Sequence, residues 1–282
     1  MRRFADKVAV ITGAGSGIGR ALALDLAGRG ARLALSDVDN ERVTETVAQC
    51  TVRGAEARAY QLDVADRAAV LAHADQVVAD FGRVNLVVNN AGVALIAPVL
   101  EMSWENLEWL MNINFWGVVH GTKAFLPHLI ESGEGHIVNV SSVFGLVGVP
   151  TQSAYCAAKF AVRGFTEALH QEMGIGRYPV GVSCVHPGGI RTNIARDSRA
   201  HPDWENPQGR ERFDQVVPTT PEKAAHIILR GVQANHARIL IGPDAYAFDA
   251  TARILGPFYQ RITTGGARLA NRFGVKSGQP RR

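Results

Sequence analysis

The sequence has few cysteines, and they form no recognisable set. Cys50, Cys156 and Cys184 are the only three in 282 residues, and none of them has the CxxC spacing of a zinc or redox motif. An odd, sparse set argues against a disulfide framework and against a metal site built on cysteine. We expect a cytoplasmic protein with no metal ion at its functional site.

Long hydrophobic runs are also lacking. The longest stretch without a charged residue, 137–158, is interrupted by polar residues and a proline, so it is too polar to span a membrane. The N-terminal residues lead into a strand-like segment without the apolar stretch and small-residue cleavage site of an exported protein. We predict neither a transmembrane helix nor export.

Acidic residues are absent from the last part of the chain. All 26 Asp and Glu residues lie at or before Asp249, whereas seven Lys and Arg residues follow Ala250. The net charge of +4 therefore divides into +7 for this tail and −3 for the remainder. A body with a net negative charge argues against nucleic-acid binding.

What the sequence does contain is a regular alternation of short apolar runs with longer segments of helical period. Strands are predicted at 7–12, 31–36, 57–64, 85–90, 136–142, 180–187 and 237–242, and helices between them at 17–29, 40–53, 67–81, 103–130, 153–174 and 222–235. This alternation is typical of βαβ units. We predict an α/β fold, a single-domain Rossmann-like, doubly wound parallel sheet of seven strands with helices on both faces.

Two segments break this rhythm. Residues 193–218 are polar and irregular, which predicts a long loop that is either functional or mobile. Residues 251–282 are predicted to be a basic C-terminal extension that frays near its end. The first 250 residues then form the domain, and no repeat or linker divides it.

The first strand runs directly into TGAGSGIG, residues 12–19, where a helix begins. Unpaired backbone amides and the helix dipole favour an anion at such a point, so a glycine-lined turn can bind a pyrophosphate. The GxGxxG spacing is missing, but TGxxxGxG fits. A glycine-rich turn without a ligand remains an alternative. The residues of this predicted site are Gly13, Ser16, Gly17, Ile18 and Gly19.

The second strand is followed by Asp37, 18 residues after Gly19. A carboxylate near this spacing can bind the hydroxyls of an adenosine ribose and would repel a 2′-phosphate. No Lys or Arg is present at position 36 or 38, so we expect NAD rather than NADP. The alternative is that Asp37 caps the next helix, which Asp39 or Asn40 could also do.

Tyr155 and Lys159 lie four residues apart in YCAAK, at the start of a predicted helix, and therefore share one helix face. An ammonium about 5 Å from the phenol, at an effective dielectric constant of about 20, supplies roughly 3 kcal/mol, or about two pK units. The pair predicts a tyrosine with a lowered pKa that acts as a general acid or base, more so beside the positive ring of NAD. Taken alone, such a pair also occurs on the solvent-exposed surface of a helix without any catalytic role.

Six motifs together resemble the short-chain dehydrogenase/reductase family. They are TGAGSGIG, LDV at 62–64, NNAG at 89–92, IVNVSS, YCAAK and HPGGIRT, in the family's order over about residues 6–242. The resemblance implies an oxidoreductase that transfers a hydride between a nicotinamide nucleotide and an alcohol or ketone, as a dimer or homotetramer. It implies the catalytic residues Asn114, Ser142, Tyr155 and Lys159. Ser142 would bind the substrate oxygen, and Asn114 would hold a water leading from Lys159 to solvent.

The resemblance also implies a cofactor cleft and a substrate pocket. Besides the glycine turn and Asp37, the cofactor residues would be Asp63, Val64, Asn90, Ala91, Gly92, Tyr155, Lys159, Pro187, Gly188, Ile190 and Thr192. The pocket wall would consist of Ala94, Leu95, Phe144, Val149 and Gln152, capped by residues 193–218. These wall residues are mostly apolar, so we expect a lipophilic secondary alcohol or ketone.

Other interpretations stay open. One is an NADPH-dependent reductase of a 3-oxoacyl or quinone-like carbonyl, and another is an NAD-sensing regulator without catalysis. In the basic tail, apolar residues interleave with arginines. Such a segment could pack on a neighbouring subunit or fray, or it could lie on an anionic membrane surface.

Overall fold

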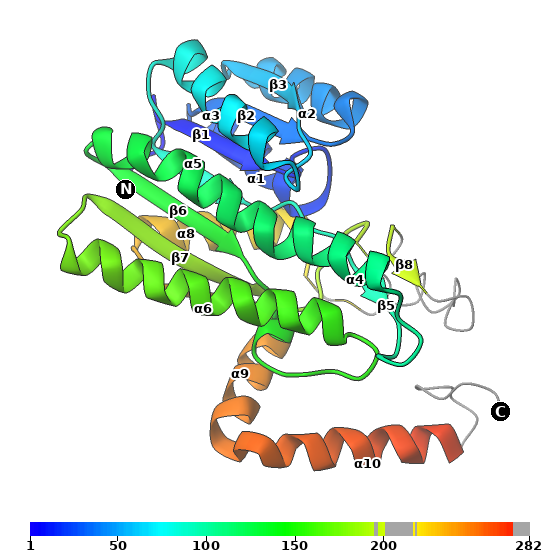
Figure 1. Ribbon diagram of the computed structural model, residues 1–282. Helices are drawn as coiled ribbons and strands as arrows, with labels where there is room; N and C mark the ends of the chain where they lie inside the picture. The colour runs from blue at the N-terminus through cyan, green and yellow to red at the C-terminus, as the bar shows by residue number, and fades with distance from the viewer. Residues whose placement is uncertain (195–196, 201–216, 218, 273–282) are drawn as a thin grey trace.

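A parallel sheet forms the centre of the molecule. The computed structural model describes residues 1–194, 197–200, 217 and 219–272 (Figure 1). Within these residues the strand order is β3-β2-β1-β4-β6-β7-β9. The strands are β1 Val8–Thr12, β2 Arg32–Asp37, β3 Ala57–Gln61, β4 Leu86–Asn89, β6 Gly135–Val140, β7 Val180–Pro187 and β9 Arg238–Ile241. The predicted seven-stranded, doubly wound α/β fold is confirmed.

Helices cover both faces of this sheet. They are α1 Gly17–Gly28, α2 Asn40–Val52, α3 Arg67–Phe81, α4 Trp104–Met111, α5 Gly117–Glu131, α6 Ser153–Ile175 and α8 Pro221–Gln233. Leu22, Val43 and Ile228 place α1, α2 and α8 in one buried apolar cluster. The cluster on the opposite face contains residues of α3, α5 and α6, which include Phe125 and Leu169. Because the sheet is covered twice, all five residues of β1 are buried, which explains its continuous apolar run.

Several elements differ from the prediction. The single helix expected at 103–130 is divided into α4, a π-helical turn at Asn112–Trp116, and α5. Two short strands, β5 Leu95–Ile96 and β8 Arg199–Ala200, pair in parallel in a second small sheet. Two residues are too few to show a strand periodicity in the sequence.

The end of the chain is more regular than expected. Helix α9, Pro243–Leu255, follows β9 directly, and after the turn Gly256–Phe258 helix α10 spans Tyr259–Arg272. The predicted division after residue 250 lies within α9 and stays a prediction. Most of the predicted loop at 193–218, and the fraying end at 273–282, lie outside the described residues. No helix in the described ranges is both long and apolar enough to cross a membrane.

The strand order creates a crevice beside the carboxyl ends of β1 and β4, where the connections diverge to opposite faces. Asn90 ties these two strand ends together. Its side-chain Nδ2 donates to the carbonyl oxygens of Thr12 at 2.9 Å and Gly13 at 3.2 Å. The Thr12 hydroxyl accepts the backbone N–H groups of Asn90 and Ala91 at 3.0 and 3.1 Å. The NNAG and TGAGSGIG motifs are therefore fixed against each other at this crevice.

Three histidines are buried in the fold and held neutral. Burial lowers the pKa of His73 to about 4, of His136 to about 3 and of His186 to about 4, from an ordinary value of 6.5. Between pH 6.5 and these values, the unfolded chain binds protons that the folded chain does not. The free energy of unfolding contributed by these groups is complete above pH 6.5 and is lost as the pH falls towards 4.

We predict that the free energy of unfolding falls by about 2 kcal/mol per buried histidine between pH 7 and about pH 5. Urea titrations at the two pH values measure it. His73→Leu, which removes one titrating group of similar size, should reduce the pH-dependent loss by roughly one third. An equal loss in the variant and the wild type would contradict this origin of the pH dependence.

Candidate active site

The glycine turn after β1 has a shape that side chains would prevent. Gly13 and Gly17 have φ values of +64° and +51°, in the left-handed region that favours glycine. A Cβ at Gly19 would collide with the Gly13 carbonyl oxygen. Helix α1 begins here with Ser16 as its N-cap, and that side chain makes no capping hydrogen bond. The first amides of α1 are therefore not taken by a side-chain cap and can bind an anion.

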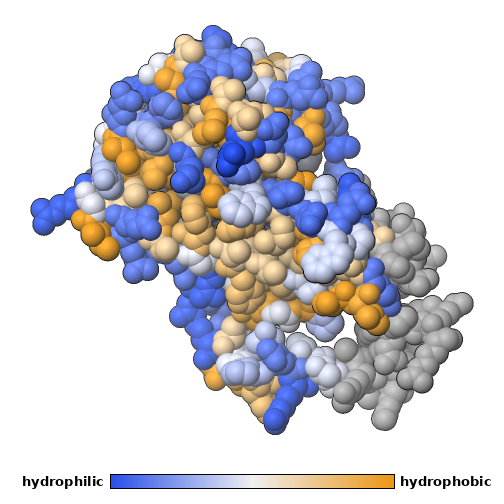
Figure 2. Space-filling model, in the orientation of Figure 1, coloured by the Kyte–Doolittle hydropathy of each residue, from blue (hydrophilic) through white to orange (hydrophobic). Residues whose placement is uncertain are grey.

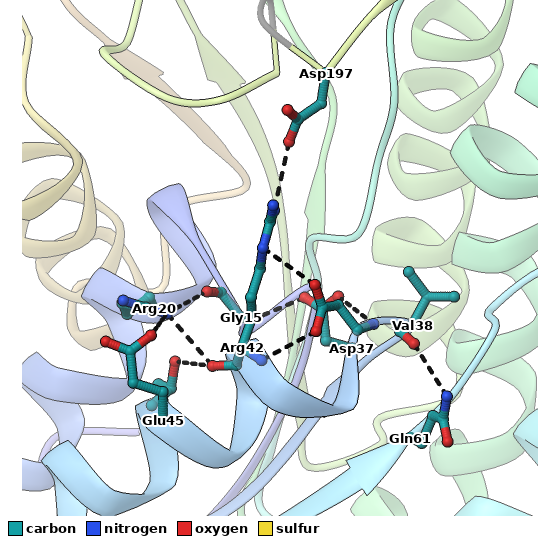
Figure 3. A network of polar contacts seen from close by, with 10 residues as sticks. Gly15, Arg20, Asp37, Val38, Arg42, Glu45, Gln61 and Asp197 are labelled. Carbon is teal, nitrogen blue, oxygen red and sulfur yellow. Dashed lines mark hydrogen bonds and ion pairs between the residues drawn. The ribbon is translucent and has the colours of Figure 1, made fainter.

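Asp37, at the end of β2, is held against this turn by two backbone amides (Figure 3). Its Oδ2 accepts the N–H of Gly15 at 2.8 Å, and its Oδ1 accepts the N–H of Asp39 at 3.1 Å. Asp39 caps α2 by accepting the N–H of Arg42. Asp39, and not Asp37, is therefore the N-cap of α2. The Asp37 carboxylate faces the glycine turn.

Arg42 is a residue near this corner that the sequence reasoning missed. Its guanidinium contacts the carboxylates of Asp39 at 3.1 Å and Asp197 at 3.5 Å (Figure 3). The sequence test for a 2′-phosphate partner considered only positions 36 and 38, whereas Arg42 comes from the first turn of α2. A positive charge therefore lies near Asp37, although two carboxylates already pair with it.

Tyr155 and Lys159 are brought together on the first turns of α6. The Lys159 Nζ lies 5.6 Å from the centroid of the Tyr155 ring and donates to the carbonyl oxygen of Val140 at 3.0 Å. Lys159 is 3% exposed, and Tyr155 is half-buried. The predicted geometry, two side chains on one helix face, is present.

The pKa of Tyr155 differs from the expected direction. Burial raises it to about 12, although a hydrogen bond with Ser142 lowers it in part. Burial also lowers the pKa of Lys159 to about 8. The same low-polarity surroundings disfavour the phenolate and the ammonium, and Lys159 directs its proton to a strand carbonyl. In the protein chain by itself, desolvation outweighs the attraction that the sequence spacing predicts.

Ser142 follows β6 and lies beside Tyr155, whereas Ser141 points elsewhere. The Ser142 Oγ accepts the N–H of Phe144 at 3.1 Å and forms the hydrogen bond with Tyr155. Its carbonyl oxygen accepts a hydrogen bond from the Nδ1–H of His186 at 3.0 Å, which supports the backbone of Ser142 from β7. Ser141 instead donates to the carbonyl oxygen of Lys159 at 2.8 Å, so its role is structural.

Asn114 lies in the π-helical turn and is fully buried. Its Nδ2 donates to the carbonyl oxygen of Val93 and its Oδ1 accepts the N–H of Val93, both at 2.8 Å. One N–H and one lone pair of the amide remain, which is what a bound water requires. A Cβ at Gly92 would lie 3.2 Å from Asn114 Oδ1 and 3.5 Å from Lys159 Nζ. Gly92 is thus the point at which Asn114 and Lys159 approach each other.

The other predicted cofactor residues lie after neighbouring strands of the sheet. Val64 packs against Gly117 at the start of α5, and the exposed Asp63 accepts the N–H of Ala65. Thr192 reaches the glycine turn, because a Cβ at Gly17 would lie 3.1 Å from its Cγ2. Pro187 ends β7, and the loop that follows contains Gly188, Ile190 and Thr192.

Asp244 is a second residue that the sequence reasoning missed. It lies in the first turn of α9, and its Oδ2 accepts the N–H of Gly189 at 2.6 Å. A Cβ at Gly188 would collide with this carboxylate. Asp244 therefore clamps the loop after β7 from α9, the helix that follows the neighbouring strand β9.

The predicted substrate residues are less uniform in position. Phe144 is half-buried, and its ring lies edge-on to Tyr155 at 6.1 Å. Leu95 is 2% exposed and packs with Leu110 and Ala158, so its side chain belongs to the core. Ala94 and Gln152 are half-buried, and Val149 lines a cavity of about 310 Å³ near α10.

Comparison with known proteins identifies the family. The family model for short chain dehydrogenases matches residues 7–203. The Mycobacterium tuberculosis protein SadH, which carries an oxidoreductase name, is 54% identical over 267 residues, covering 94% of this chain and 97% of SadH. The chain belongs to the short-chain dehydrogenase/reductase family. It is an enzyme of the dehydrogenase/reductase type.

Two further relatives extend this result within the short-chain dehydrogenase/reductase family. The C alpha-dehydrogenase of Sphingobium sp. is 35% identical over 255 residues, covering 86% of this chain and 83% of that protein. A family member from Burkholderia phymatum, solved in complex with NAD, is 31% identical, with a TM-score of 0.83 and full coverage of both chains. The family fold binds a nicotinamide nucleotide.

The residues of the crevice fit such a nucleotide. The positive-φ glycines and the N-terminus of α1, without a side-chain cap, fit a pyrophosphate, and Asp37 fits a ribose hydroxyl pair. Within the described part of the chain, no three His, Cys, Asp or Glu side chains gather into a metal-binding group. All three cysteines are free and buried.

We predict that Asp244→Ala raises the Kd for the bound nucleotide by tenfold or more, because a hydrogen bond to a carboxylate contributes about 1.5–3 kcal/mol. Fluorescence titration with the reduced nucleotide measures it. Asp249→Ala serves as control, since it removes another α9 carboxylate, which pairs with Arg238 and Arg253. A Kd that is the same in both variants would rule out the clamp.

Proposed function

We propose that the enzyme transfers a hydride between NAD(H) and a secondary alcohol or ketone, acting mainly as an alcohol dehydrogenase. The observation that carries this proposal is the arrangement of Ser142, Tyr155 and Lys159 at the mouth of the crevice, with Asn114 meeting Lys159 at Gly92. This set has the chemistry needed to move one proton at a substrate oxygen. A regulator that only senses nucleotide has no need for it.

Each residue has a separate role in the reaction. As the phenolate, Tyr155 takes the proton of the substrate hydroxyl during oxidation, and as the phenol it returns that proton during reduction. Ser142 donates a hydrogen bond to the substrate oxygen as negative charge develops there. Lys159 holds its positive charge next to the Tyr155 ring, and Asn114 supports a water path from Lys159. When bound, the nicotinamide supplies the carbon that exchanges the hydride and, in its oxidised form, a positive ring that favours the phenolate.

The substrate class follows from the apolar surroundings of Tyr155. Phe144 and Val149 leave a largely apolar approach, so we assign a lipophilic alcohol or ketone. A panel of secondary alcohols, hydroxysteroids, polyols and acyl thioesters, followed by absorbance of the reduced nicotinamide, tests the assignment. Faster turnover of polyols than of apolar alcohols would reject it.

We also assign a homo-oligomeric assembly, a dimer or tetramer, in the cytoplasm. Trp104 and Trp116 near the π-helical turn are 78% and 47% exposed, and tryptophans exposed to this extent favour a subunit interface. The three free, buried cysteines suit a reducing compartment.

Replacing Tyr155 tests the proposed catalysis. Tyr155→Phe should lower kcat by about a thousandfold, because it removes the proton that the reaction exchanges, while the Kd for the reduced nucleotide stays within about threefold. Stopped-flow turnover and fluorescence titration measure the two quantities. Tyr178→Phe, at an exposed tyrosine beyond α6, is the matched control. Unchanged turnover of Tyr155→Phe would favour the non-catalytic alternative.

An NADPH-dependent reductase is the second candidate function, and Arg42 is the observation that favours it. Its guanidinium lies close enough to the Asp37 corner to pair with a 2′-phosphate if it leaves Asp39 and Asp197. The reason to prefer NAD is that Asp37, held in place by two amides, repels that phosphate.

Nucleotide affinities decide between the two. We predict that the wild type binds NADH about tenfold or more tightly than NADPH, that Asp37→Asn reduces this preference, and that Arg42→Gln combined with Asp37→Asn weakens NADPH binding again. Fluorescence titrations with both nucleotides measure the Kd values. Asparagine keeps the size of the side chain and can still accept one of the two N–H groups, that of Gly15 or that of Asp39. A wild type that binds NADPH more tightly contradicts the assignment.

A further inference from the structure

Helices α9 and α10 form an arm that projects from the body of the enzyme (Figures 1 and 2). A hydrogen bond from the N–H of Gly148 to the Tyr259 hydroxyl, at 2.8 Å, joins α10 to the body. Residues 260–266 of α10 are all exposed. A helix held in this way derives little stability from the enzyme's own core.

The orientation of α10 is opposite to that of an ordinary surface helix. The cavity of about 310 Å³ between α10 and residues 148–153 is lined, on the helix side, by Tyr259, Gln260, Thr263 and Thr264. The polar face therefore faces the body. On the other side lie Phe258, the residue just before α10, and Ile262, four residues later, which are 51% and 55% exposed. Surface helices normally turn their apolar stripe inwards, so the outward stripe of α10 needs a partner outside the described chain.

Charge indicates the chemistry of that partner. The Arg261 guanidinium lies 5.8 Å from the centre of the Phe258 ring and so borders the stripe. In the sequence, five further Lys and Arg residues follow Arg261, and no Asp or Glu follows Asp249. The described part of the outward face thus carries two exposed apolar side chains with a guanidinium beside them, in a stretch of the chain that has no carboxylate side chain.

A second copy of α10 is a poor partner for this face. In a two-fold symmetric contact the same surface meets itself, so arginines would face arginines without a carboxylate to pair with. The helix has 14 residues, too few to cross a bilayer. An apolar line bordered by arginines instead fits the boundary between the headgroups and acyl chains of anionic lipids.

We propose that the outward face of α10 is a docking surface for anionic membranes, on which the helix lies in the plane of the lipid headgroups. Ile262 and Phe258 enter the acyl boundary, and Arg261 pairs with a lipid phosphate. The Gly148–Tyr259 hydrogen bond connects this surface to the segment that precedes α6, which carries Tyr155. The bound membrane would therefore lie beside the end of the enzyme where the reacting residues gather.

Flotation of the full chain with lipid vesicles tests the proposal. One set contains phosphatidylcholine alone, and the other roughly one third phosphatidylglycerol. We expect binding to the anionic vesicles at low salt, loss of binding at about 0.5 M salt, and little binding to the neutral vesicles. Absence of binding to anionic vesicles at low salt overturns the proposal.

A matched pair of variants separates the contribution of the apolar stripe to membrane binding from that of the net charge. Ile262→Asp and Thr264→Asp change the net charge equally, but only the first removes a side chain of the outward stripe. Partitioning of Ile262→Asp should fall about tenfold further than that of Thr264→Asp. Thermal melting and nucleotide binding confirm that both variants fold. Equal losses of vesicle binding in the two variants overturn the proposal. If Ile262→Asp instead changes only the molar mass measured by light scattering, the face binds a second copy of the chain, which also overturns the proposal.

Discussion

The structure depends on the side chain of Asn90, which joins the carboxyl ends of β1 and β4. Its amide donates to the Thr12 and Gly13 carbonyl oxygens, while Thr12 accepts the amides that follow β4. These bonds decide where the crevice opens and how the glycine turn is shaped. Gly19 packs against the same atoms, because a Cβ there would lie against both Gly13 and Asn90. The glycine turn is thus fixed to the segment after β4, which leads to Gly92 beside Asn114 and Lys159.

Burial gives the reacting residues opposite pKa shifts with one cause. The pKa of Tyr155 is raised to about 12 and that of Lys159 is lowered to about 8, so at pH 7 the phenol is neutral while Lys159 still carries its positive charge. A phenolate beside an ammonium in such surroundings is stable only when both are hydrogen-bonded. Ser142 and the Val140 carbonyl oxygen supply two of those hydrogen bonds. Tyr155 therefore needs a further positive charge nearby before its phenolate is favoured.

Sequence spacing predicted the parts of the site that are local in the chain. The seven strands, the glycine turn, and the pair of Tyr155 and Lys159 follow from periodicity or from one helix turn. Arg42, His186 and Asp244 act through contacts between separate strands and helices, and nothing in their spacing reveals them. The π-helical turn at Asn112–Trp116 could not be predicted either, because its residues are equally compatible with an α-helix. Of these missed features, only helix α9 could have been predicted from sequence, because Pro243 and Asp244, which follow Gly242, are typical of the first turn of a helix.

Helix α9 connects the loop after β7 with helix α10. Its first turn carries Asp244, which clamps Gly189 in the loop after β7, and its far end leads into α10. Asp249 pairs with Arg238 of β9 and fixes the middle of α9 to the sheet edge. A helix of 13 residues is about 20 Å long. The loop that Asp244 clamps and helix α10 are therefore attached to the two ends of one short helix, whose middle is anchored to the sheet edge.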